Sequence, residues 1–177
     1  LDFGAQHARY GFGVQPKSDR LLGAHVGLRA FSILGERNFH QRQFIRVDRA
    51  LLLAAAVEDD AFHRPQRGEE YHFPEAAFGL RQLHMVVSRG DEVLSGAFRI
   101  NETDRALGYN GPESMEPLVS LARRVQEVLG ETEKFKFELH DFSPNSAYIM
   151  NPNLYVHSHG EYWRNADQLN YYVNLIG

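Results

Sequence analysis

Two histidines near the C-terminal end are the residues best suited to chemistry in this sequence. His157 and His159 stand one residue apart in LYVHSHGEYW, whose alternation is typical of a β-strand. Side chains two positions apart on a strand point to the same face, so both imidazoles can bind one metal ion. Glu161 follows on that face as third ligand or general base, and His140 of an earlier predicted strand is the alternate ligand. The pattern therefore predicts a divalent metal site, with zinc as the expected ion.

Zinc held by three protein ligands keeps one position open for water, and it lowers the pKa of that water towards ~7. The predicted function is accordingly that of a metal-dependent hydrolase or lyase. The sequence contains no HExxH motif and no cysteine. A related hypothesis is metal-assisted cleavage of a nucleic-acid strand, with Tyr171 or Tyr172 as the attacking group, but Ser158 stands where such histidine pairs usually enclose a hydrophobic residue.

A non-catalytic hypothesis uses the aromatic and amide side chains of the same stretch. If residues 154–163 and 168–176 pair as a β-hairpin, four of these side chains join the histidines on one face. They are Tyr155, Trp163, Asn170 and Asn174. Aromatic rings stack against sugars or peptides, and amides supply directional hydrogen bonds. The alternative is therefore a binding module for a small polar molecule, a glycan or a protein.

The remaining pattern predicts an α+β domain built on an antiparallel sheet. Strands are expected over 80–88, 92–101 and 134–142, in addition to the C-terminal hairpin. An amphipathic helix is expected over about 115–129, where apolar residues recur at spacings of three and four and Gly130 supplies the stop. We expect this helix to pack on the apolar face of the sheet, which leaves the polar face for function.

Less regular segments are expected around this sheet, within one domain spanning residues 1–177. A strand is predicted over 26–34 and a short buried helix over 49–57. Residues 1–20 are rich in glycine and predict an extended arm. Residues 58–75 carry two prolines and many charges, and predict a long loop able to act as a lid.

The charge pattern limits the partners. The chain has a formal net charge of −4, yet residues 1–50 carry eight Lys/Arg against four Asp/Glu. The excess centres on a basic cluster, which predicts either an anionic ligand or an internally paired or solvated face. Its members are Arg37, Arg42, Arg46 and Arg49. Because the whole chain is acidic, nucleic acid is disfavoured as a general partner. No apolar run approaches the ~20 residues of a membrane span, and the absence of cysteine leaves the compartment open.

Overall fold

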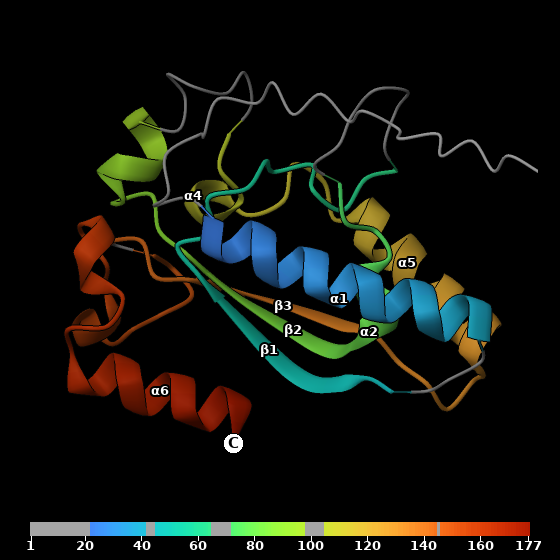
Figure 1. The fold of residues 1–177 in the computed structure, drawn as a ribbon. Coiled ribbons are helices and arrows are strands. Elements are labelled where there is room, and N and C mark those ends of the chain that lie inside the picture. Colours follow the sequence, from blue (N-terminus) through green and yellow to red (C-terminus); the bar gives the residue numbers. More distant parts are fainter. Residues whose placement is uncertain (1–21, 42–44, 65–71, 98–104, 145) are drawn as a thin grey trace, which may run out of the picture.

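The fold is built on a three-stranded sheet whose strands all run parallel. The computed structural model describes residues 22–41, 45–64, 72–97, 105–144 and 146–177. Strands β1 (Val47–Leu53), β2 (Leu80–Val87) and β3 (Lys136–Asp141) lie in the order β1-β2-β3 (Figure 1). Both neighbouring pairs are parallel. The prediction of an antiparallel sheet is wrong, because a long connection follows each of the first two strands and returns the chain to the same end of the sheet.

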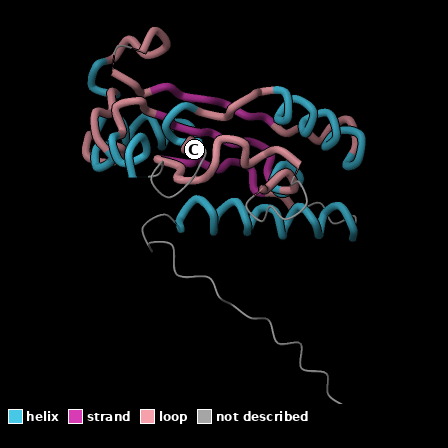
Figure 2. Tube along the Cα trace, turned by 90° about the horizontal axis from the view of Figure 1, so that it is seen from above, coloured by secondary structure: helices cyan, strands magenta, loops and turns pink. Residues whose placement is uncertain are grey.

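Helices and single turns connect and flank these strands. The longer helices are α1 (Leu22–Gln41), α5 (Glu116–Leu129) and α6 (Ala166–Ile176). The short ones are α2 (Ala76–Gly79), α4 (Leu107–Asn110), the π-turn η1 (Val93–Ala97) and the 3-10 turns η2 (Pro152–Leu154) and η3 (His159–Glu161). Viewed from above, α1 forms a separate layer beside the strands (Figure 2). None of the described helices is long and apolar enough to cross a membrane.

One face of the sheet carries the larger hydrophobic core. Alternate residues of β1 and β2 point into it, among them Leu52, Leu83 and Met85. Helix α1 contributes Leu28 to this core. The helix predicted over 115–129 is confirmed as α5. Its buried side chains are Leu118, Leu121 and Val125. Gly130 ends α5 with a φ of 111°, a conformation that glycine adopts at little cost.

The opposite face is apolar at one end and polar at the other. Near the carboxyl ends of the strands, Val86 packs with Phe142, Tyr162 and Tyr172, the last of which comes from α6. Towards the amino ends, the side chains of this face become polar. The register aligns Arg49, Gln82 and Lys136, followed two residues on by Leu51, His84 and Glu138. The sheet therefore positions a row of polar side chains next to the buried cluster around Val86.

Several predicted elements are corrected by this structure. The predicted strand over 26–34 lies inside α1, and the predicted helix over 49–57 begins as β1. The C-terminal hairpin does not form, since residues 154–177 pass through η2 and η3 into α6. The Asn165 side chain accepts a hydrogen bond from the backbone N–H of Asp167 and caps this helix. Helical spacing then buries Gln168 and Tyr172, four residues apart.

Two other predicted segments fall partly outside the described residues. The strand predicted over 92–101 begins instead as η1, and its remainder is not described. The predicted arm over 1–20 lies entirely outside, as do residues 65–71 of the predicted lid. On either side of that gap, Phe62 and Phe73 are buried in the larger core, and the backbone N–H of Phe73 donates to the carbonyl of Ala61. The flanks of the loop are therefore packed against the domain.

Candidate metal centre

Two neighbouring strands bring two imidazoles and a carboxylate to the polar face of the sheet. His84 in β2 is the direct register partner of Glu138 in β3, and Val86 is the partner of His140. Residues of equal parity on paired strands share a face. His84, Glu138 and His140 therefore converge within three consecutive register positions of the two strands.

The three side chains approach one another closely enough to bind one ion. The Nδ1 atom of His84 lies 3.1 Å from Nε2 of His140 and 3.5 Å from Oε2 of Glu138. One ligand atom from each residue lies within 4.8 Å of the others, and no other group of three such ligands does so among the described residues. Ligands at 2.0–2.1 Å in a tetrahedral zinc site stand roughly 3.3 Å apart. The 3.1 Å and 3.5 Å separations lie on either side of that value.

Neighbouring polar groups orient two of these ligands. Gln82 Nε2 donates a hydrogen bond of 2.7 Å to Oε1 of Glu138, which leaves Oε2 towards His84. The hydroxyl of Tyr171 in α6 lies 3.0 Å from Nδ1 of His140. Such contacts fix the ring orientation of a ligand histidine and select the nitrogen that faces the metal. Helix α6 therefore contributes to the centre although it supplies no ligand.

Burial favours the neutral form of both imidazoles. Removal from water lowers the pKa of His84, and the positive charge of Arg49 lowers it further while Glu138 raises it. Burial is also the main cause that lowers the pKa of His140, followed by its neighbour His84. A neutral imidazole is the form that binds metal. The side chain of Glu138 is 44% exposed, so the centre is open to solvent on one side.

The histidine pair predicted to bind metal lies elsewhere and is not brought together with Glu161 as a ligand set. His159 in η3 places its Nδ1 atom 2.8 Å from the buried carboxylate of Asp91. The exposed His157 donates its backbone N–H to Oε2 of Glu161 at 2.6 Å. His140 is the one predicted ligand that belongs to the cluster. The shared face failed to form because residues 157–161 are not a strand.

The aromatic and amide residues of the predicted binding face are dispersed. Asn170 and Asn174 are exposed on α6, whereas Tyr172 is buried in the smaller core. The Tyr155 hydroxyl donates to the carbonyl of Ile149, and the half-exposed Trp163 lies beside His159 at 6.4 Å between ring centroids. No hairpin face gathers these side chains, and a role of Trp163 in ligand binding stays a prediction.

The arginines of the basic cluster predicted near the N-terminal end do not form one patch among the described residues. The guanidinium of Arg46 is fully buried and bonds the carboxylate of Glu133 at 2.9 Å and three backbone carbonyls. Arg37 is exposed on α1, and Arg42 lies outside the described residues. Arg49 is exposed beside the polar row of the sheet. Arg46 therefore has an internal structural role, and Arg49 alone lies near the candidate centre.

His84 is absent from the ligand set predicted from the sequence. The available signal was parity, since His84 on one predicted strand and Glu138 and His140 on another could share a face. That signal becomes informative only when the two strands are known to be neighbours.

Comparison with known proteins adds no further constraint, since no family description, curated protein sequence or solved structure matches this chain.

Proposed function

We propose that this protein is a metal-dependent enzyme of the hydrolase type, whose divalent ion is bound by His84, Glu138 and His140. The observation that supports this proposal is the convergence of two imidazole nitrogens and one carboxylate oxygen within 4.8 Å. Two imidazoles and a carboxylate form a well-known catalytic zinc ligand set. Three protein ligands leave a coordination position for water or substrate.

A divalent ion in such a site acidifies bound water and polarises an oxygen of the substrate. The chain's own groups prepare the site for this role. His84 and His140 are neutral because of burial, so little free energy is spent on deprotonating them. Gln82 holds one oxygen of Glu138, and Tyr171 contacts the outer nitrogen of His140. Tyr171 is a positioning residue, because it acts through His140.

Zinc binding is the first test of this proposal. Protein without a histidine tag is dialysed to equilibrium against zinc, as wild type, as His140→Ala and as the double variant His157→Ala/His159→Ala. We expect about one zinc per chain in the wild type, because the chain offers one three-ligand cluster among its described residues. We expect affinity to fall at least about tenfold in His140→Ala, with the double variant unchanged.

The double variant is a matched control, since it removes two imidazoles outside the cluster. Failure of the wild type to bind zinc, or loss of zinc from the double variant alone, would overturn the proposal. Hydrolysis of phosphate-ester and carboxylic-ester reporter substrates is then measured with and without chelator. Activity that survives both chelation and His84→Ala would contradict a metal-dependent mechanism.

A further inference from the structure

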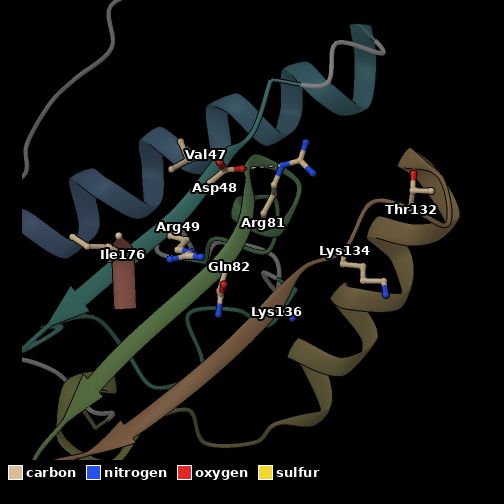
Figure 3. A pocket seen from close by; sticks show the side chains of 10 residues that line it. Val47, Asp48, Arg49, Arg81, Gln82, Thr132, Lys134, Lys136 and Ile176 are labelled. Atoms are coloured by element: carbon tan, nitrogen blue, oxygen red, sulfur yellow. Dashed lines mark ion pairs between the residues drawn. The ribbon is translucent and has the colours of Figure 1, made fainter. Parts of the chain in front are cut away.

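An open cavity lies at the amino ends of the three strands, next to the candidate metal centre. Its volume is about 610 Å³, and its walls include the first residues of β1, β2 and β3 and the last residues of α6 (Figure 3). Gln82 lines this cavity and also donates its hydrogen bond to Glu138. One side chain therefore belongs to both the cavity and the centre.

The cavity is rich in positive charge that carboxylates do not neutralise. Arg49, Lys134 and Lys136 are exposed cations in its wall. Within the described part of the chain, none of the three forms an ion pair with a carboxylate. A guanidinium nitrogen of Arg49 instead donates to the carbonyl of Leu175 at 3.3 Å, which holds the side chain near the cavity without cancelling its charge.

The other two charged side chains of the cavity wall, Arg81 and Asp48, form an ion pair with each other, and Arg81 also bonds Glu133, which lies outside the wall. Arg81 bonds the carboxylate of Asp48 at 3.2 Å and that of Glu133 at 3.1 Å. Figure 3 shows the ion pair of Arg81 and Asp48 beside the row occupied by Arg49 and Gln82. The net charge presented to a ligand therefore comes from Arg49, Lys134 and Lys136.

The register fixes the distance between this charge and the candidate centre. Arg49, Gln82 and Lys136 are aligned across the sheet, and His84 and Glu138 follow two residues further along the same face. Two residues of a strand span about 7 Å.

We propose that this cavity binds an oxyanion, a carboxylate or a phosphate group, carried by the substrate. This inference rests on the proposed function, because it assigns a substrate class to the same centre. When the anionic group of a substrate binds between Arg49 and Lys136, a substrate atom about 7 Å from that group lies beside His84 and Glu138. The substrate is then a small organic anion that is cleaved at a bond about that far from its charged end. Arginine suits this task, because its planar guanidinium binds carboxylate and phosphate through two parallel hydrogen bonds.

Anion binding is tested separately from metal binding by calorimetric titration of chelator-treated protein. Inorganic phosphate and acetate are the two probes, so that the stronger one identifies the type of oxyanion. The test variant is Arg49→Gln/Lys136→Gln, and the control is Arg29→Gln/Arg123→Gln, which removes two exposed cations from helices α1 and α5. We expect the test variant to bind the preferred probe about tenfold to a hundredfold more weakly, with the control unchanged.

Zinc dialysis of the same variants distinguishes the two proposals. Arg49→Gln/Lys136→Gln should retain the zinc stoichiometry of the wild type, and His140→Ala should retain anion binding. No binding of either probe to the wild type, or equal losses in the test and control variants, would overturn the anion site while leaving the metal site intact. Anion binding that depends on Arg49 and Lys136 in a protein that binds no zinc would uphold the anion site and reject the proposed function.

Discussion

The imidazoles of His84 and His140 meet edge to edge across two parallel strands, with ring centroids 5.3 Å apart and an interplanar angle of 29°. Their facing nitrogens are only 3.1 Å apart. Two protonated rings at this separation would repel each other, and burial already disfavours the charged forms. A divalent ion between the nitrogens would use both lone pairs. This histidine pair is therefore the structural basis of the proposed centre.

The Tyr171→Phe variant tests the orienting contact from α6. It removes the hydroxyl that lies 3.0 Å from Nδ1 of His140 and leaves the ring in place. Because loss of such an outer contact weakens metal sites by about 10–100-fold, zinc affinity should fall by about tenfold. The measurement is competitive zinc titration against a chelating dye. Tyr155→Phe is the control, since that hydroxyl bonds the carbonyl of Ile149 instead, and an equal loss in both variants would contradict the role of Tyr171.

The Arg46→Met variant tests the internal role of the buried guanidinium. Its removal leaves the carbonyls of Ala77, Leu80 and Lys134 without this donor and breaks the contact with Glu133. We expect the free energy of unfolding, measured by urea denaturation, to fall by about 3 kcal/mol. Arg29→Met is the matched control, because Arg29 is exposed and lies 3.9 Å from Glu36, and it should cost less than about 1 kcal/mol. If the free energy of unfolding falls as little in Arg46→Met as in Arg29→Met, Arg46 is a surface residue in solution.

The Gly35→Ala variant tests the close approach of α1 and α2. A Cβ atom at Gly35 would overlap the carbonyl of Glu75, and one at Gly79 would overlap the carbonyl of Phe31. The substitution should therefore lower the free energy of unfolding by about 3 kcal/mol, since backbone must move to make room. Gly27→Ala in the same helix meets no atom within 4 Å and should stabilise by about 0.5–1 kcal/mol. Chemical denaturation measures both, and a stabilised Gly35→Ala protein would rule out this helix contact.

Tyr162 should make the protein sensitive to alkaline pH. Burial raises its pKa above the usual value, and the nearby carboxylate of Asp91 raises it further. Above pH ~10 the unfolded chain loses the tyrosine proton while the folded chain keeps it. The folded state then binds more protons, so the free energy of unfolding falls as pH rises beyond that point. Between pH 8 and about pH 11, the free energy of unfolding measured by urea denaturation should fall less in Tyr162→Phe than in wild type. An identical fall in the two proteins would refute this explanation.

Local pattern predicted part of this structure well. Helix α5 was recognised because its apolar residues keep a helical spacing that ends at Gly130. The strands β2 and β3 were recognised, and so was the shared parity of Glu138 and His140. Long-range pairing was not, since nothing in a local pattern says that β2 lies between two parallel neighbours. In the structure every residue of β2 from Leu83 to Val87 is buried, as is typical of a central parallel strand, but the polar His84 interrupts its apolar run.

The errors near the C-terminus have a different cause. Residues 168–176 alternate between polar and apolar types, yet Asn165 caps a helix there and Tyr172 is buried four residues after Gln168. Short segments satisfy both periodicities, and tertiary packing decides between them. A metal site at His157 and His159 was expected because residues 154–176 were predicted to form this hairpin, which the structure does not contain. Of the predicted ligands, only His140 lies in the cluster.

Crystallography of the zinc-loaded protein tests whether His84, Glu138 and His140 bind the ion. An anomalous difference map calculated at the zinc edge locates the ion without assumptions about its ligands. Our account predicts a peak about 2.0–2.2 Å from Nδ1 of His84, from Nε2 of His140 and from a carboxylate oxygen of Glu138. An empty cluster, or zinc bound instead by His157 and His159, would contradict it.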